Sequence, residues 1–134
     1  MAPETNIELV RAGLEALNGG DLDACIELAS PDLIISLAEL PEPLHGRDTW
    51  REGAAMFRRA FPDVHAEIED IFCSGDRVAV RLRMRGTHEG EYLGIPPSGR
   101  TVSYVSHEFY RIEDGLIAEE WICSDTAGLF QQIA

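Results

Sequence analysis

Two glutamates, Glu108 and Glu120, are the residues of this chain whose type and spacing best suit acid–base chemistry. They lie in two runs rich in β-branched and aromatic residues that flank Glu113-Asp114-Gly115, which indicates a β-hairpin because glycine supplies the positive φ of a tight reversal. With a three-residue loop, Ile112 pairs with Leu116, and Glu108 lies directly opposite Glu120. Two carboxyl groups opposed on an apolar sheet face cannot easily both ionise, so we expect one raised pKa and a group able to move a proton near neutral pH.

The pairing of the hairpin decides which side chains share a face with the glutamates. A two-residue Asp114-Gly115 turn would instead pair Glu108 with Trp121, so the register is itself a prediction. In the expected register, His107 and Asp125 point to the opposite face. The face of the two glutamates then also carries Tyr104, Ser106, Tyr110, Ala118, Ile122 and Ser124.

A helical hairpin is expected at the start of the chain. Thr5 and Glu8 form a capping box for a helix over about residues 6–18, and a second helix follows over about residues 21–29. Gly19-Gly20 separates the two helices.

A third helix is expected to begin at Asp48 and to end before Pro62. Its aromatic stripe favours a core face, although on a fold with an internal pocket the same stripe would also contact a substrate. The stripe consists of Trp50, Ala54, Phe57 and Phe61.

Strands are expected over about residues 33–38, 64–72 and 77–86, ahead of the hairpin. In the segment 77–86, apolar residues alternate with arginines, so one face of the strand is apolar and the other is basic. Three alternatives are open for the arginines: an exposed basic face, pairing with carboxylates of a neighbouring strand, or a subunit interface. If the arginines instead reached Glu108 and Glu120, the acid pair would be a neutralised structural network. Arg81 is grouped with the two glutamates as a catalytic candidate.

The order helix, helix, strand, helix and four strands predicts one α+β domain over residues 1–134. A curved antiparallel sheet would wrap around the N-terminal helices to form a cone with an internal apolar pocket. The segment 86–100 is rich in glycine and proline and could cover the mouth of that pocket. The candidate substrate-binding residues are Trp50, Phe57, Phe61, His88, Tyr104, Tyr110 and Ile122.

Composition excludes several classes of function. A formal net charge of −13 over 134 residues opposes binding to nucleic acid or to anionic membranes. All basic residues are arginine, so a lysine Schiff base is excluded. Cys25, Cys73 and Cys123 lack metal-ligand spacing and suit a reducing cytoplasm, and no apolar run approaches the roughly 20 residues that span a bilayer. A cytoplasmic protein without a bound metal is therefore expected.

Three segments resemble the SnoaL-like polyketide cyclase family of the nuclear-transport-factor-like superfamily. They are G-T-H-x-G at 86–90, G-I-P-P-S-G-R at 94–100 and Y-R-I-x-D-G-x-I-x-E-x-W at 110–121. The resemblance implies the α+β cone, a homodimer or homotetramer packed through the outer sheet face, and acid–base chemistry on aromatic polyketides without a bound cofactor.

The chain departs from the family pattern at two positions. The resemblance implies a catalytic aspartate where this chain has Ile122, and a helper histidine where it has Glu108. Members without the aspartate resemble hydroxylases of anthracycline-type rings, which implies molecular oxygen as co-substrate and a short-chain reductase partner. The alternatives are an aldol cyclase or a ketosteroid-isomerase-like enzyme that uses Glu108 or Glu120, and a non-catalytic module that binds a small ligand.

Overall fold

The computed structural model describes residues 3–134, which form four helices and one six-stranded sheet. In chain order the elements are α1 (Pro3–Asn18), α2 (Leu22–Glu27), β1 (Ala29–Leu37), β2 (Leu44–His45), α3 (Arg47–Ala60), β3 (His65–Ser74), β4 (Arg77–Thr87), β5 (Thr101–Glu113), β6 (Leu116–Ser124) and α4 (Thr126–Ile133).

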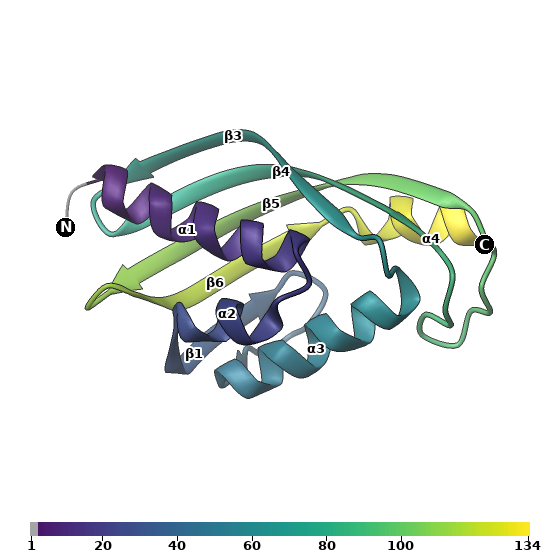
Figure 1. The fold of residues 1–134 in the computed structure, drawn as a ribbon, viewed down its shortest axis with the longest axis horizontal. Helices are drawn as coiled ribbons and strands as arrows, with labels where there is room; N and C mark the ends of the chain where they lie inside the picture. The colour runs from purple at the N-terminus through teal and green to yellow at the C-terminus, as the bar shows by residue number, and fades with distance from the viewer. Residues whose placement is uncertain (1–2) are drawn as a thin grey trace.

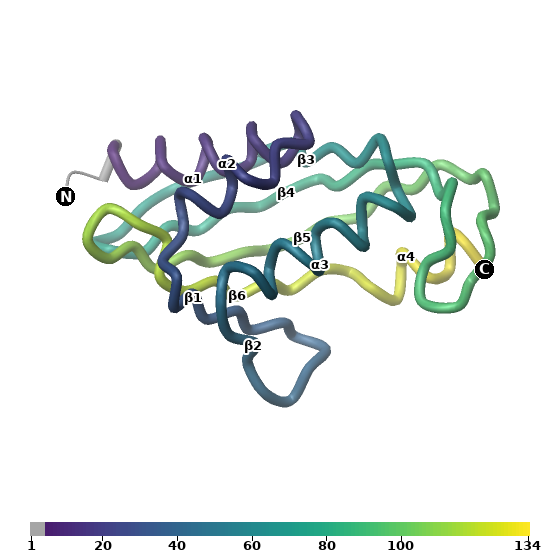
Figure 2. Tube along the Cα trace, turned by 60° about the horizontal axis from the view of Figure 1, so that its bottom comes forward, coloured from purple at the N-terminus to yellow at the C-terminus, as the bar shows by residue number. Residues whose placement is uncertain are grey.

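The sheet has the strand order β2-β1-β6-β5-β4-β3 and curves around the helices, as Figure 1 shows. Strands β3 to β6 are antiparallel neighbours, whereas β1 runs parallel to β6. Helix α1 packs against β3, and α3 packs against α2 and β1. The view in Figure 2 shows α1 and α3 over the same face of the sheet. The expected α+β cone is confirmed.

The β5–β6 hairpin turns through two residues rather than three. Asp114 and Gly115 have φ of 51° and 76°, and Glu113 pairs with Leu116. Two consecutive positive φ angles are typical of the tight turn whose twist matches that of the flanking strands. The expected three-residue loop is therefore wrong.

A β-bulge at Ala118 restores the side-chain alternation that the shorter turn would have reversed. Ile112 pairs with Ile117 and Arg111 with Glu119, so Ala118 is the extra residue on β6. Both Ile117 and Ala118 are buried, and the strand beyond them alternates in the expected phase. The inward face was thus predicted correctly, although by an incorrect turn.

Helices α1 and α3 begin at other residues than the sequence indicated, whereas Asp21 is the N-cap of α2 as expected. Helix α1 starts at Pro3, so Thr5 lies inside it and cannot cap it, and Gly46 rather than Asp48 is the N-cap of α3. Helix α4 was not expected; the Asp125 side chain caps it by accepting a hydrogen bond from the Gly128 backbone N–H at 2.9 Å.

The protein has a main apolar core between the helices and the sheet, and a second apolar cluster that closes the end of the cone near α4. Phe57 and Phe61 stack with ring centroids 4.8 Å apart, and Tyr92 packs edge-on against both rings. Tyr92 also stacks on Phe130 of α4. The loop 88–100 therefore packs on this cluster.

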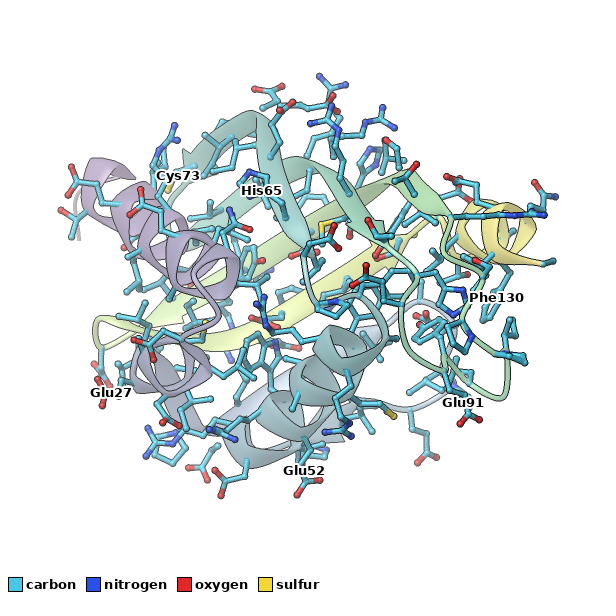
Figure 3. The ribbon with its side chains drawn as sticks, turned by 45° about the vertical axis from the view of Figure 1, so that its right-hand side comes forward. Glu27, Glu52, His65, Cys73, Glu91 and Phe130 are labelled. Atoms are coloured by element: carbon cyan, nitrogen blue, oxygen red, sulfur yellow. The ribbon has the colours of Figure 1, made fainter. Side chains whose placement is uncertain are left out.

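The outside of the molecule is strongly acidic. Figure 3 shows Glu27, Glu52 and Glu91 projecting away from the fold, in keeping with the net charge of −13. None of the helices found in residues 3–134 has both the length and the apolarity needed to cross a bilayer.

Candidate active site

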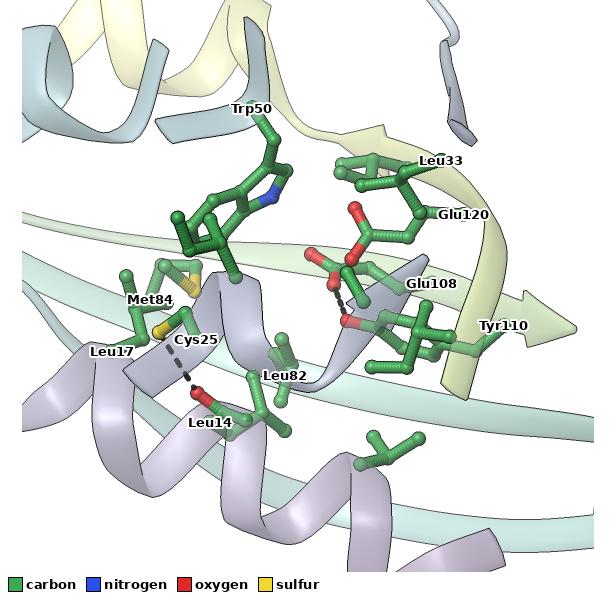
Figure 4. Close-up of a pocket in the computed structure, with 16 residues that line it drawn as sticks. Leu14, Leu17, Cys25, Leu33, Trp50, Leu82, Met84, Glu108, Tyr110 and Glu120 are labelled. Atoms are coloured by element: carbon green, nitrogen blue, oxygen red, sulfur yellow. Dashed lines mark hydrogen bonds between the residues drawn. The ribbon is translucent and has the colours of Figure 1, made fainter. Parts of the chain in front are cut away.

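A cavity of about 130 Å³ lies between the helices and the concave face of the sheet (Figure 4). Helices α1, α2 and α3 form one wall, and strands β1, β4, β5 and β6 form the other. Its lining is mostly apolar and consists of Val10, Gly13, Leu14, Leu17, Cys25, Ile26, Ala29, Leu33, Trp50, Leu82, Met84, Glu108, Tyr110, Ile117, Glu120 and Ile122.

Glu108 is held on β5 by hydrogen bonds to both carboxyl oxygens. The Tyr110 hydroxyl donates to Oε1, and Ser106 Oγ donates to Oε2 at 2.8 Å. A further hydroxyl, Ser124 Oγ, lies 2.9 Å from Ser106 Oγ. Burial raises the pKa of Glu108, while the two hydrogen bonds lower it because they stabilise the carboxylate.

Glu120 lies on β6 opposite Tyr110 and is only 7% exposed. Its Oε2 has no hydrogen-bond partner among residues 3–134. Burial and then repulsion from Glu108 raise the pKa of Glu120 to about 8. Glu120 therefore favours its protonated form at neutral pH. The two hydrogen bonds to Glu108 favour the carboxylate of that residue, against the effect of its burial.

The two glutamates are diagonal rather than directly opposed. Ile122 is the residue opposite Glu108, and Tyr110 is the residue opposite Glu120. Both carboxyl groups nevertheless line the same cavity, as Figure 4 shows. The expected direct pairing is wrong, whereas the expected shared face is confirmed.

Arg81 was expected to join the glutamates as a catalytic residue, but it lies on the opposite face of the sheet. Its guanidinium is 3.9 Å from Glu69 of β3, and Arg83 and Arg85 contact Glu69 and Glu67 in the same way. The arginines thus pair with a neighbouring strand, and they do not neutralise the acid pair. The alternation along β4 places Arg81 outside whenever Leu82 points inward.

The candidate substrate-binding residues divide between two places. Trp50, Tyr110 and Ile122 line the cavity. Phe57, Phe61 and Tyr104 belong to the second apolar cluster instead. The stripe along α3 contributes Trp50 to the cavity and Phe57 to the cluster, because the helix is long enough to pass from the cavity to the closed end of the cone.

His88 does not line the cavity, and the loop that contains it does not cover the cavity. The His88 side chain is fully buried and stacks on Phe61 at 5.4 Å between ring centroids. Its Nδ1 accepts a hydrogen bond from the Ser98 backbone N–H at 3.1 Å, so the ring proton of the neutral form is on Nε2. His88 therefore ties the two ends of the loop together.

His107 and Asp125 do not face the acid pair. His107 is exposed on the outer face of β5, and Asp125 caps α4. Leu14, Leu17 and Cys25 line the cavity but were not expected there, since an apolar helix face has the same sequence pattern whether it meets a core or a cavity.

Cys25 lines the cavity as a neutral thiol. Its Sγ donates to the Gly13 carbonyl at 3.5 Å. Burial, followed by the nearby charges of Asp21 and Glu120, raises the pKa of Cys25 to about 11, which disfavours the nucleophilic thiolate. Within residues 3–134, no three His, Cys, Asp or Glu side chains are grouped so that they could hold a metal ion.

The model of the family described as "SnoaL-like polyketide cyclase" matches residues 7–133, nearly the whole chain. The chain belongs to the SnoaL-like polyketide cyclase family. Among its SnoaL-like relatives is aklanonic acid methyl ester cyclase DnrD of Streptomyces peucetius, which is 30% identical over 132 residues, covering 96% of this chain and 90% of DnrD.

Two solved SnoaL-like structures share both fold and sequence with the chain. AclR of Streptomyces galilaeus, a candidate hydroxylase, has a TM-score of 0.90 and 28% identity, covering 98% of this chain and 82% of AclR. IdmH of Streptomyces antibioticus, a candidate polyketide cyclase, has a TM-score of 0.84 and 35% identity, covering 95% of this chain and 96% of IdmH.

Proposed function

We propose that this SnoaL-like protein is an acid–base enzyme of aromatic polyketide biosynthesis that removes a proton from a carbon next to a carbonyl group. The observation that carries this proposal is the pair Glu108 and Glu120 in one apolar cavity, where Glu108 accepts two hydrogen bonds and Glu120 Oε2 accepts none from residues 3–134. Pairs of titratable groups whose pKa values are pushed apart are typical of acid–base catalysis. Glu108 acts as the base and Glu120 as the acid.

The size of the cavity limits what enters it. About 130 Å³ is less than the roughly 300–1,000 Å³ of common ligand pockets, so one part of a polycyclic substrate enters and the remainder lies toward the opening. The reacting carbon belongs to the part inside, because the two carboxyl groups are there.

The more specific proposal is hydroxylation of a polycyclic quinone without a bound cofactor. It is supported by Ile122, which cannot carry a proton and stands opposite Glu108, and by the similarity to AclR. Glu108 takes the substrate proton, the remaining electron pair forms a C–O bond with dioxygen, and the proton of Glu120 completes a hydroperoxide. Two electrons and two protons, supplied by a reductase through a reduced quinone, then give the alcohol and water.

Intramolecular aldol cyclisation is the second candidate, supported by the similarity to DnrD. Glu108 would take the same proton, the carbanion would attack a ketone of the same substrate, and Glu120 would protonate the new alkoxide. The reaction needs no oxidant, which distinguishes it from hydroxylation.

Oxygen consumption separates these two reactions. The protein is incubated with aklanonic acid methyl ester, a quinone reductase and NADPH in a sealed oxygen electrode, and the products are identified by mass spectrometry. Oxygen uptake with a product heavier by one oxygen atom supports hydroxylation, and ring closure under anaerobic conditions supports the cyclase. E108Q and E120Q should each lower turnover at least roughly 100-fold, whereas E119Q, which changes an outward-facing glutamate, should not.

The same variants test whether the protein is a binding module only. If the protein binds hydroxyanthraquinones without turnover, and E108Q and E120Q bind them as tightly as the natural chain, the acid–base proposal is wrong.

We further propose a homodimer or homotetramer formed through the outer face of the sheet. Phe72 and Phe109 are 60% and 53% exposed there. Together with Ala79 and Trp121 they form one row across β3, β4, β5 and β6. Two exposed phenylalanines in one row favour contact with a second subunit.

A further inference from the structure

The indole of Trp50 places a hydrogen-bond donor in the otherwise apolar helical wall of the cavity. Figure 4 shows the Trp50 ring across the cavity from Glu108 and Glu120, with its nitrogen on the side that faces the two carboxyl groups. No hydrogen bond joins this nitrogen to another residue drawn there. Trp50 is partly buried, and the indole N–H can only donate a hydrogen bond. An unpaired indole N–H that faces a cavity therefore marks a position for an acceptor on a ligand.

The other polar groups of the cavity show what kind of ligand would fit. Glu108 already accepts hydrogen bonds at both oxygens, and the Cys25 thiol is directed to a backbone carbonyl. Glu120 Oε2 is buried without a partner among the described residues. A donor on α3 and an acid on β6 therefore remain unpaired on facing walls of the same small cavity.

We infer that Trp50 Nε1–H binds the carbonyl oxygen of a ketone substrate whose neighbouring carbon lies against the acid pair. When Glu108 takes the proton, the C–H bond breaks, its electron pair forms a C=C bond, and the carbonyl becomes an enolate C–O⁻. The indole hydrogen bond strengthens as this oxygen gains charge in a mostly apolar cavity. The inference rests on the proposed function for the proton step, but the contact between indole and carbonyl can be tested separately.

The contact is tested by NMR on the natural chain, which has two tryptophans and therefore two indole N–H signals. W121F assigns them. The ¹⁵N-labelled protein is titrated with 1-tetralone, a small ketone with an acidic neighbouring C–H, and with tetralin, which has the same two rings and no carbonyl. We expect 1-tetralone to move the Trp50 indole proton downfield, tetralin to move it much less, and neither to move the Trp121 signal.

Two results would overturn the inference: equal shifts of the Trp50 signal with both compounds, or no shift with 1-tetralone at saturating concentration. Neither result depends on a variant that folds poorly. Deuterium exchange at the carbon next to the carbonyl of 1-tetralone in D₂O gives a second readout. W50F should lower kcat for this exchange roughly 100-fold with little change in KM, and W121F should leave kcat unchanged.

The two readouts also separate failure of the inference from failure of the proposed function. A carbonyl-dependent Trp50 shift without any exchange would refute proton transfer and retain Trp50 as the carbonyl-binding residue. Exchange that persists in W50F, without a carbonyl-dependent shift, would refute the role of Trp50 and retain proton transfer.

Discussion

The Tyr110 hydroxyl donates a hydrogen bond to Glu108 Oε1, two residues earlier on the same face of β5. This bond and the one from Ser106 oppose the effect of burial on the pKa of Glu108. Tyr110 thus favours the ionised form of the proposed base.

Replacing Tyr110 with phenylalanine should raise the pKa of Glu108 further, because the carboxylate loses its strongest stabilising donor. The lost bond should also lower the free energy of unfolding by roughly 1.5–3 kcal/mol, the range for hydrogen bonds to charged groups. The pKa can be followed by ¹³C NMR of labelled glutamate side chains. Y104F, which removes a buried hydroxyl from the second apolar cluster, is the matched control. An unchanged Glu108 titration in Y110F would contradict this prediction.

Glu120 should make the protein less stable as the pH rises. Its pKa is raised from 4.5 to about 8 in the folded state, so the folded protein binds this proton more tightly than the unfolded chain. The free energy of unfolding therefore falls between about pH 4.5 and pH 8, by about 1.4 kcal/mol for each pKa unit. E120Q should match the natural chain near pH 4 and exceed it by a few kcal/mol at pH 9.

Urea denaturation at pH 4, 7 and 9 measures this effect. E119Q changes the adjacent glutamate, which faces outward and pairs with Arg111, and should keep the decline with pH. If the free energy of unfolding of E120Q falls with pH as much as that of the natural chain, another group causes the fall.

Two glycine substitutions should change stability in opposite directions. A Cβ on Gly90 would lie 2.2 Å from the Arg59 carbonyl oxygen, so G90A must displace the loop from the end of α3. We expect a loss of more than about 2 kcal/mol. Gly53 is exposed within α3 and a Cβ there meets nothing within 4 Å, so G53A should stabilise the protein by roughly 0.5–1 kcal/mol. Thermal and urea midpoints check both values, and a tolerated G90A would contradict the close packing.

The outer face gives a prediction about assembly. F109E places a charge in the aromatic row and should convert the proposed oligomer to monomers, as measured by light scattering after size exclusion. M56E, which changes an exposed apolar residue of α3, should leave the mass unchanged. A natural chain that is monomeric at every concentration would contradict the proposed interface.

Side-chain alternation made much of the site predictable from sequence. The pattern along the hairpin placed Glu108 and Glu120 on one face. The pattern along β4 separated Leu82 from Arg81, but grouping Arg81 with the glutamates was wrong, because Arg81 lies on the outer face beside Glu69. The fold class followed from the order of helices and strands together with the family resemblance.

Features that depend on long-range packing could not be predicted. The sequence of α3 does not distinguish an aromatic residue that meets the cavity, such as Trp50, from one that packs on a closed cluster, such as Phe57. The bulge at Ala118 could not be predicted from the sequence either. It is needed because a two-residue turn without a bulge would direct the wrong face of β6 toward the core. The correct face was therefore reached only because two registers that differ by two residues share the same alternation.

That single extra residue in β6 determines which side chains a substrate would meet. If the strand were regular beyond its turn, Glu119 and Trp121 would point inward, and Glu120 and Ile122 would point outward. The interior could thus exchange an aliphatic contact for an aromatic one, and one glutamate for another, with no change in amino-acid composition. Gain or loss of a bulge at the position of Ala118 is accordingly a second way, besides substitution of site residues, in which proteins of this architecture could diverge in chemistry.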